Sequence, residues 1–194
     1  MESRIDKNGL LEKLAAWNSF LKRKVRLIAC GGTALTLLDI KPSTKDIDLL
    51  VPVSEEYIYL IKILRDLGYK SASGSGLARD DGFVFDLFPG KRVHTTELLV
   101  SPLDDGNNIP VKEFSQIYVG ILNYYDLLIS KLFRGTSIDI EDCLALVRRK
   151  RTEIDMERFI GRFNETASYD VSEDKARGNL EYFKKILRKE KLLS

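Results

Sequence analysis

Residues 30–51 read CGGTALTLLDIKPSTKDIDLLV, and this stretch decides the fold that we predict for the chain. Two adjacent glycines, Gly31 and Gly32, follow a short apolar run, and an Asp-x-Asp follows a Pro-Ser-Thr turn. Bare backbone at the start of a helix lets a phosphate approach free N–H groups. Closely spaced carboxylates supply the hard oxygen ligands that a divalent cation prefers. Both features together suit a site for a nucleoside triphosphate and its metal.

Composition narrows the function classes before any motif is considered. The chain has 194 residues and a formal net charge of +2, from 31 Lys and Arg against 29 Asp and Glu. This balance gives no strong overall field for nucleic acid, so binding of that kind would depend on local patches. Two cysteines and one histidine are too few for a disulfide framework or a zinc cluster. The N-terminus lacks the apolar stretch of a signal peptide and no apolar run spans a bilayer, so we expect a cytoplasmic protein without a membrane partner.

Hydrophobic periodicity divides the chain into two parts. In the first part we predict helices over residues 10–22 and 54–67 and strands over residues 25–30, 46–51, 83–89 and 114–120, with a strand-turn-strand unit over 98–111. In the second part we predict four helices, over residues 123–133, 138–150, 155–165 and 172–190. The expected fold class is α/β (α+β), with a small mixed sheet flanked by helices and a C-terminal helical bundle. The expected domains are an α/β domain over 1–120 and a helical region over 121–194.

Three aspartates occupy positions that favour a metal site. Alternate side chains of a strand share a face, so Asp46 and Asp48 lie together on one face of the strand predicted for 46–51. A half-exposed strand with acids on its outer face explains this pair equally well. Asp86 interrupts an otherwise apolar face of the strand predicted for 83–89. Because a buried carboxylate is costly unless it is paired or bound to a metal, Asp86 favours the metal site.

The donor set indicates which metal to expect. An oxygen-only site suits Mg²⁺, which takes its remaining ligands from water and substrate phosphates. We therefore expect Asp46, Asp48 and Asp86 to bind Mg²⁺, with two ions as the expected number. Two ions can activate an attacking hydroxyl and neutralise a leaving pyrophosphate. Without a cation, three clustered carboxylates would repel one another.

The glycine pair has two explanations. Tight packing between a strand and a helix accounts for many Gly-Gly pairs. Here Gly31, Gly32 and Thr33 also stand at a predicted helix N-terminus, where free N–H groups and the helix dipole favour an anion, and Thr33 adds a hydroxyl. The segment is neither a Walker loop nor a Rossmann fingerprint. The carboxylates that follow favour the phosphate explanation.

In this order of elements, residues 31–50 resemble the signature of the nucleotidyltransferase superfamily, which has a DNA polymerase β-like fold. That signature consists of glycines, a helix, an Asp-x-Asp on a strand and a third acid on a later strand. The residues of this chain that match it, position by position, are Gly31, Gly32, Asp46, Asp48 and Asp86. The resemblance implies metal-dependent transfer of a nucleoside monophosphate from a triphosphate such as ATP to an acceptor hydroxyl, with release of pyrophosphate.

Two cations stand out in the helix predicted for 123–133. At 100° per residue, Lys131 falls inside the apolar stripe, and Arg134 lies on the same side one turn later. A lysine in this position commonly extends its ammonium group to water. Alternatively, the pair can hold triphosphate oxygens, as expected for a nucleotide-binding site.

The next helix carries Asp139 and Asp142 on one face, where complementing the helix dipole is a sufficient role for at least one of them. Together with Lys131 and Arg134, they resemble the Lys, Arg and Asp-x-x-Asp segment of the abortive-infection (AbiEii-like) nucleotidyltransferases, with a shorter spacing. That group includes toxins of toxin–antitoxin pairs, so an antitoxin is a candidate further partner, although toxin status itself depends on genomic context and does not follow from the resemblance.

These observations lead to one predicted function and one alternative. We expect an Mg²⁺-dependent nucleotidyltransferase whose acceptor is an RNA or tRNA end or a protein. In it, Asp46 and Asp48 bind both ions, Asp86 binds the catalytic ion and deprotonates the acceptor hydroxyl, and the nucleotide is bound by Gly31, Gly32, Thr33, Lys131 and Arg134. The alternative is a non-catalytic nucleotide- or RNA-binding module with the same fold. The basic runs at 148–151 and 184–191 favour solvated helix ends over an RNA surface, because few aromatic residues interleave with them.

Overall fold

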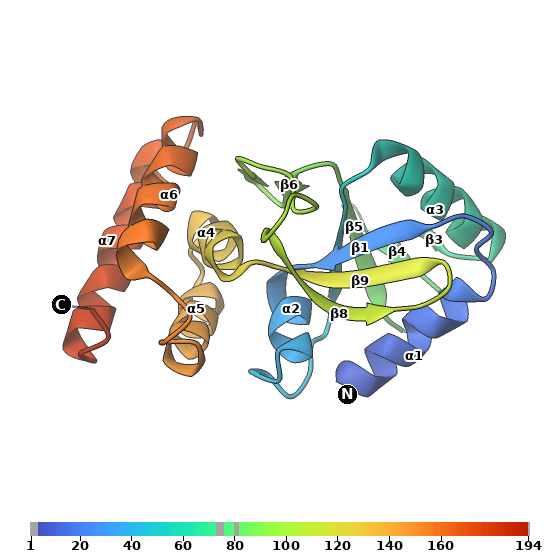
Figure 1. The fold of residues 1–194 in the computed structure, drawn as a ribbon, viewed down its shortest axis with the longest axis horizontal. Helices are drawn as coiled ribbons and strands as arrows, with labels where there is room; N and C mark the ends of the chain where they lie inside the picture. The colour runs from blue at the N-terminus through green and yellow to red at the C-terminus, as the bar shows by residue number, and fades with distance from the viewer. Residues whose placement is uncertain (1–3, 73–75, 80–81, 194) are drawn as a thin grey trace.

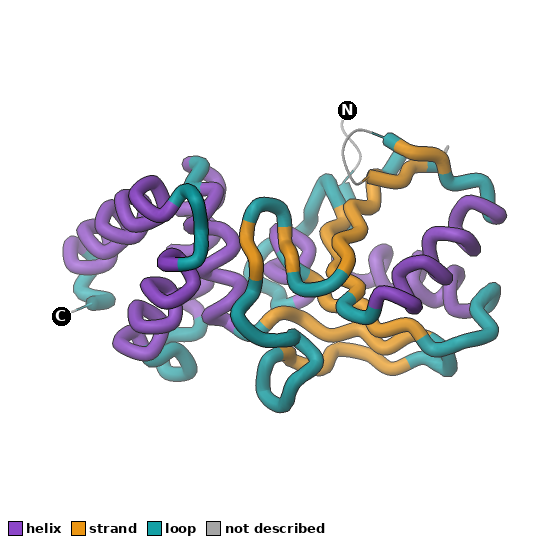
Figure 2. The backbone as a smooth tube through the Cα atoms, turned by 90° about the horizontal axis from the view of Figure 1, so that it is seen from above, coloured by secondary structure: helices purple, strands orange, loops and turns teal. Residues whose placement is uncertain are grey.

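The computed structural model describes residues 4–72, 76–79 and 82–193, and its elements form a sheet part and a helical part. Figure 1 shows strands and the first three helices on one side, with the last four helices stacked beside them. Figure 2, seen from above, shows the orange strands gathered in one part together with helices, and the other part built of purple helices and teal loops. One continuous hydrophobic core contains residues from both parts.

A seven-stranded mixed sheet forms the first part, in the order β3-β4-β5-β2-β1-β9-β8. Its strands are β1 (Val25–Ala29), β2 (Ile47–Val51), β3 (Lys70–Ser71), β4 (Gly76–Ala78), β5 (Val84–Pro89), β8 (Asn108–Glu113) and β9 (Ile117–Leu122). β2 runs antiparallel to β1 and parallel to β5, while β1 is parallel to β9. A separate two-stranded hairpin consists of β6 (Arg92–Val93) and β7 (Thr96–Glu97).

The two faces of the sheet have different neighbours. α1 (Lys7–Asn18) covers one face, where the Trp17 ring packs 4.5 Å from the ring of Phe85. On the other face, the ring of Phe88 packs against His94 at 4.6 Å, at the tip of the β6–β7 hairpin. Because successive side chains of β5 alternate between faces, Asp86 shares the face of Phe88. The aspartate thus points toward the hairpin and not toward α1.

Seven helices complete the fold within the part of the chain that the structure describes. They are α1, α2 (Gly31–Leu37), α3 (Ser54–Asp66), α4 (Tyr124–Arg134), α5 (Ser137–Arg149), α6 (Met156–Ser168) and α7 (Glu173–Lys189). Between α4 and α5 the chain turns sharply, because Gly135 takes the left-handed conformation (φ 66°) and Thr136 closes a capping box with Asp139. This turn brings α4 and α5 together beside α2. Among the described helices, none is long and apolar enough to cross a membrane.

The α/β fold class is confirmed, and most predicted elements are found within a few residues. The four C-terminal helices lie where their periodicity predicts them. The first helix begins at Lys7, earlier than predicted, because the Asp6 side chain accepts a hydrogen bond from the Gly9 N–H and caps it. The strand predicted at the start of 98–111 is wrong, since the chain is irregular there and the β6–β7 hairpin precedes it. Strands of two residues have no detectable periodicity, which explains the omission.

Candidate active site

Sheet register brings Asp48 and Asp86 together. The two residues are direct partners on the parallel strands β2 and β5, so their side chains leave the sheet on the same face. Asp48 is only 7% exposed and Asp86 is half-buried. Two of the three predicted metal ligands therefore stand side by side on neighbouring strands.

Asp46 lies at the edge of this pair. It precedes β2, is exposed, and contributes to the raised pKa of Asp48 by charge repulsion. Within the described ranges, no three His, Cys, Asp or Glu side chains converge as a ready set of metal ligands. The protein thus presents a pair of carboxylates with a third nearby, which suits an ion that completes its shell with water and substrate phosphate.

Both glycines are explained by close contacts to this site. A Cβ on Gly31 would overlap Oδ2 of Asp48, and the residue has φ +55°, a left-handed conformation that other residues rarely adopt. A Cβ on Gly32 would lie 2.8 Å from the hydroxyl of Thr44. The turn therefore needs glycine in order to let the Asp48 carboxylate pack against the backbone. Whether the same backbone also binds a phosphate stays a prediction.

Thr33 was expected at the helix N-terminus with its hydroxyl available to an anion, but its hydroxyl is used inside the protein. The helix begins at Gly31 with Cys30 at the N-cap position, and Thr33 is fully buried inside its first turn. Its hydroxyl accepts a hydrogen bond from the Asp48 N–H (2.9 Å) and donates to the Asp46 carbonyl (3.2 Å). Thr33 therefore fixes the backbone of both aspartates relative to α2.

Electrostatics make Asp48 unusual for a carboxylate. Burial, assisted by repulsion from Asp86 and Asp46, raises its pKa to about 7, although Arg134 and Lys131 act in the opposite direction. The nearby ring of His94 has its Nε2 3.6 Å from Oδ1 of Asp48. Near neutral pH, Asp48 thus stands between its protonated and charged forms, and a bound cation would favour the charged form.

His94 lies between Asp48 and α4. Burial and the neighbouring Arg134 guanidinium lower the pKa of His94 to about 4, so the ring is neutral at physiological pH. Its Nε2 lies 2.7 Å from Nη1 of Arg134, and a neutral ring accepts this hydrogen bond at that nitrogen. The residue has φ +52°, a conformation in which histidine is enriched among non-glycine residues.

Lys131 is buried, and the idea that it extends to water is wrong. The residue is 2% exposed, and its Nζ lies 2.7 Å from Asp142 and 3.6 Å from Asp139. Asp142 also binds Lys41, from the turn before β2, at 2.8 Å. The ammonium group is held among carboxylates of α5 at the interface between the sheet and the helical bundle.

Arg134 continues the same network. Its Nη2 contacts Asp139 at 2.5 Å, while its Nη1 faces His94. Burial alone would raise the pKa of Asp139, but hydrogen bonds from Thr136 and Arg134 outweigh it and lower that pKa. Asp139 also closes the capping box of α5 and stands in its first turn, where the predicted complement to the helix dipole requires an acid. A polar chain thus joins Asp48 to α5 through His94 and Arg134.

Sequence reasoning missed two members of this network. His94 was considered only as evidence against zinc, because a lone histidine in a hairpin of two-residue strands carries no periodic signal. Lys41 stands in a turn that connects α2 to β2, 101 residues from Asp142, its partner. Only the tertiary fold reveals such a long-range pair.

Comparison with known proteins identifies the fold. No family model matches the chain, and neither does any curated protein sequence. The crystal structure of ANT(2'')-Ia in complex with adenylyl-2''-tobramycin matches with a TM-score of 0.55 and 17% identity, over 82% of this chain and 96% of that one. The chain has a nucleotidyltransferase fold.

Two further structures also match. The solution structure of the antibiotic-resistance factor ANT(2'')-Ia gives the same TM-score of 0.55 at 16% identity, over 82% of this chain and 90% of that one. An antigenic nucleotidyltransferase-like protein from Paracoccidioides brasiliensis is 14% identical, with a TM-score of 0.44 over 90% of this chain and 95% of that one. At such identities the likeness to ANT(2'')-Ia establishes the fold alone, and the function has to be argued from the site.

Proposed function

We propose that the protein is a metal-dependent nucleotidyltransferase, which transfers a nucleoside monophosphate from a triphosphate to an acceptor hydroxyl and releases pyrophosphate. The pairing of Asp48 with Asp86 beside the glycine turn of α2 carries this proposal. Two carboxylates on adjacent strands, one of them buried enough to have a pKa of about 7, are a costly arrangement for a purely structural purpose. A nucleotidyltransferase fold with these acids on neighbouring strands supports the proposal further.

The residues present fit Mg²⁺. Asp48 and Asp86 would bind it from the sheet, and Asp46, exposed at the edge, would add a third carboxylate. When bound, the metal supplies charge neutralisation for the triphosphate and lowers the pKa of the acceptor hydroxyl. In the proposed reaction, Asp86 accepts the proton of the hydroxyl, because it is the more accessible member of the pair.

The phosphate-binding groups would come from α2 and α4. Gly31 and Gly32 offer the backbone N–H groups that begin a helix, and Thr33 holds them beside the acids. Lys131 and Arg134 contribute positive charge near Asp48, where they partly oppose the rise in the pKa of that carboxyl group. Both cations are paired with acids of α5 in this structure, so triphosphate would compete with Asp139 and Asp142 for them.

The acceptor and the partners belong to the proposal as well. An RNA or tRNA end or a protein hydroxyl remains the proposed acceptor class, and an antitoxin remains a proposed partner. The matched crystal structure of ANT(2'')-Ia contains adenylyl-2''-tobramycin, which adds tobramycin to the acceptors worth testing. The described side chains assign no residue to a nucleobase, so all four triphosphates need to be compared.

One observation favours the alternative of a non-catalytic binding module. Lys131 is held by Asp142 and Asp139, and the described acids do not converge as three ligands. A module that binds nucleotide without transferring it needs neither a free lysine nor a complete pair of metal sites. This alternative predicts Mg²⁺-dependent binding without turnover.

A transfer assay separates the two functions. The protein is incubated with each α-labelled triphosphate, with and without Mg²⁺, in the presence of total RNA, a protein lysate or tobramycin. Label in an acceptor, dependent on Mg²⁺ and accompanied by pyrophosphate, supports the transferase. Triphosphate binding in calorimetry without label in any acceptor supports the binding module, and equal binding in EDTA contradicts the metal site.

A further inference from the structure

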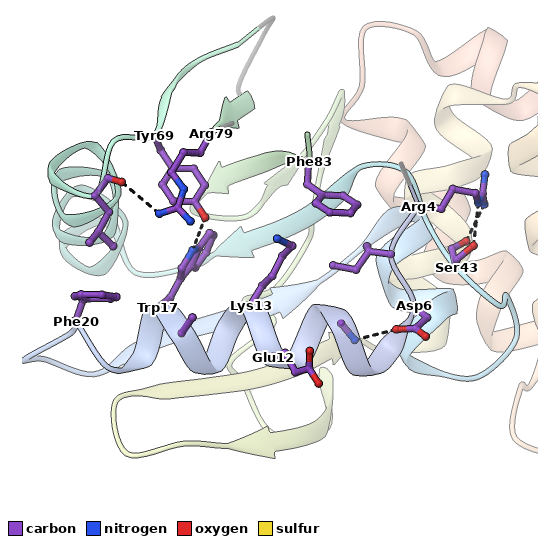
Figure 3. Close-up of a pocket in the computed structure, with 14 residues that line it drawn as sticks. Arg4, Asp6, Glu12, Lys13, Trp17, Phe20, Ser43, Tyr69, Arg79 and Phe83 are labelled. Carbon is purple, nitrogen blue, oxygen red and sulfur yellow. Dashed lines mark hydrogen bonds between the residues drawn. The ribbon is translucent and has the colours of Figure 1, made fainter. Parts of the chain in front are cut away.

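A cavity lies on the opposite face of the sheet from the aspartates of the candidate active site. It has a volume of about 750 Å³ and runs along α1, between that helix and the β3–β5 edge of the sheet (Figure 3). We call it the α1 pocket, and its main lining side chains are Arg4, Lys13, Trp17, Tyr69, Arg79 and Phe83. A cavity of this size accommodates a nucleotide or a molecule of similar dimensions.

The helix face that lines the α1 pocket leaves it open. The residues of this face recur at intervals of three to four, which places them on one side of α1 and its C-terminal turn. They are Asp6, Gly9, Lys13, Ala16 and Phe20. Glycine and alanine occupy little volume, so the groove between the larger side chains stays unfilled. The cavity is consequently elongated along the helix, as Figure 3 shows from Arg4 at one end to Phe20 at the other.

Three cations from separate segments surround this groove. Arg4 precedes α1, Lys13 is in its middle and Arg79 follows β4. Two acids also line the pocket, but Asp6 is engaged as the cap of α1 and Glu12 is exposed. Among the described lining residues, three cations outnumber two acids, and the cations are spread along the groove as in a site that follows a phosphate backbone.

Two of these cations, Lys13 and Arg79, each lie over an aromatic ring. The guanidinium of Arg79 sits 5.1 Å from the ring centroid of Tyr69, and Nζ of Lys13 sits 4.7 Å from that of Phe83. Phe20, at the rim, is 54% exposed, a high value for a large apolar ring. Tyr69 and Trp17 are buried and form the floor of the pocket, so Phe20 and the half-buried Phe83 are the rings on which a base can stack, while the cations bind phosphates.

The α1 pocket is distinct from the candidate active site. Phe83 and Asp86 lie three positions apart on one extended segment, so their side chains point to opposite faces of the sheet. Ser43, whose Oγ and carbonyl accept hydrogen bonds from Arg4, precedes Asp46 by three residues. The pocket and the acids thus share one end of the sheet and are separated by its thickness.

We propose that the α1 pocket binds a nucleotide unit, a base with its phosphate, in an unpaired RNA strand. The spread of cations favours a strand over a free nucleotide, since one phosphate cannot reach both ends of the groove. Binding to the pocket requires no metal, because cations of the protein meet the phosphate. The aspartates of the candidate active site, which would need a metal, lie on the other face of the sheet. The proposal therefore stands or falls independently of the transferase activity.

Trp17 provides a direct measurement. It is the single tryptophan of the chain and lines the α1 pocket, with its indole N–H donating to the Tyr69 hydroxyl at 3.0 Å. The full-length protein in EDTA is titrated with an unlabelled RNA hexamer, with AMP and with inorganic phosphate while Trp17 fluorescence is followed. EDTA removes the metal that the aspartate site needs, so a response reports on the pocket.

Matched arginine variants locate the binding. Arg79→Ala removes one cation of the pocket, whereas Arg158→Ala removes an exposed arginine on α6 that sits 5.3 Å from the Tyr125 ring in the same kind of stack. We expect the first variant to weaken hexamer binding about 5-fold or more and to reduce the salt slope by about 0.7, the contribution of one single-strand phosphate contact. The second variant should bind like the wild type, and Arg79→Lys should retain most of the affinity.

Each outcome bears on the proposal. A Trp17 response to the hexamer that Arg79→Ala weakens and Arg158→Ala does not supports it. Equal binding of AMP and hexamer overturns the assignment to a strand, because it shows that cations beyond the reach of one phosphate contribute nothing. Absence of any response at about 50 mM salt, where phosphate contacts are strong, overturns it. An equal loss of hexamer binding in both arginine variants overturns the proposal too, and so does binding of inorganic phosphate that is as strong as that of AMP. Neither outcome requires the rings of this pocket.

Discussion

Two pairs of aspartates lie at the interface between the sheet and the helices, and their surroundings differ in how they affect the negative charge of the carboxylates. On α5, Asp139 and Asp142 contact Arg134 and Lys131 at 2.5 and 2.7 Å. Hydrogen bonds and these cations overcome burial and lower the pKa of Asp139. This pair is neutralised by the protein itself.

On the sheet, Asp48 shares a face with Asp86 in surroundings that disfavour its charge. Burial, together with Asp86, raises the pKa of Asp48 to about 7, and its neighbour His94 is neutral at physiological pH. The cations that act on Asp48, Arg134 and Lys131, are already bound to the α5 pair. The comparison shows that cations of the protein itself stabilise the charged form of Asp139, whereas burial and a neighbouring acid destabilise the charged form of Asp48.

Asp86→Asn should have the largest effect, because it removes the proposed base while preserving shape. We expect transfer to fall about 10²-fold or more, with Mg²⁺-dependent triphosphate binding largely retained through Asp48 and Asp46. Labelled-nucleotide transfer is measured beside a calorimetric titration, with the exposed Asp66→Asn on α3 as the control. Unaltered transfer would show that Asp86 is structural.

Asp142→Asn tests the neutralised pair. The change leaves Lys131 and Lys41 without a shared charged partner, and breaking a buried ion pair in this way should lower the free energy of unfolding by about 2–3 kcal/mol. Urea unfolding measures the loss. Glu190→Gln, which breaks an ion pair with the exposed Arg148, should cost less than about 1 kcal/mol. Similar losses in the two variants would contradict the assignment of Asp142 to a stabilising network.

Asp48→Asn tests the pair on the sheet, and here the substitution should raise the stability of the protein where Asp142→Asn lowers it. The pKa of Asp48 is raised from 3.8 to about 7 in the folded protein, so the wild type loses stability as pH rises between these values. The asparagine variant does not titrate and should be more stable than the wild type by about 1–2 kcal/mol above pH 7, with no such gain near pH 4. Unfolding curves across this pH range in EDTA measure the difference in stability between the two proteins. A difference that does not change with pH would contradict the raised pKa of Asp48.

Magnesium itself should have the smallest effect. Because the ion must displace the proton of Asp48, we expect Mg²⁺ to raise the melting temperature of the wild type by about 2–4 °C at pH 8 and hardly at all below pH 6. The Asp48→Asn variant should show no shift at either pH. Thermal unfolding at matched ionic strength provides the test, and an equal shift in the variant would place the bound ion elsewhere.

Strong local patterns made much of this fold predictable. The apolar runs of β1, β2 and β5 and the periodic faces of α4 to α7 are each long enough to reveal their type. The alternation of β5 also revealed Asp86 as an anomaly. The metal and nucleotide roles assigned to these residues stay predictions, because the structure shows their placement and not their ligands.

Interactions between distant segments were not predictable. The sequence placed Lys131 within an apolar stripe but could not show that Asp142 and Asp139 receive it, since that depends on the angle between α4 and α5. Thr33 was expected to offer its hydroxyl to a phosphate, whereas its burial against β2 depends on how α2 docks on the sheet. Such pairs arise from tertiary packing, which a single sequence does not encode in a periodic form.

Thr33 has a mechanical consequence. Its hydroxyl is bonded to the backbone at both Asp46 and Asp48, and Gly31 lies against the Asp48 carboxylate, so α2 and β2 behave as one rigid body. A displacement of the glycine turn would carry the acids with it, and their mutual spacing would hardly change. A movement between the sheet part and the helical part would instead break the contacts that join them, the ion pair of Lys41 with Asp142 and the hydrogen bond of Arg134 with His94.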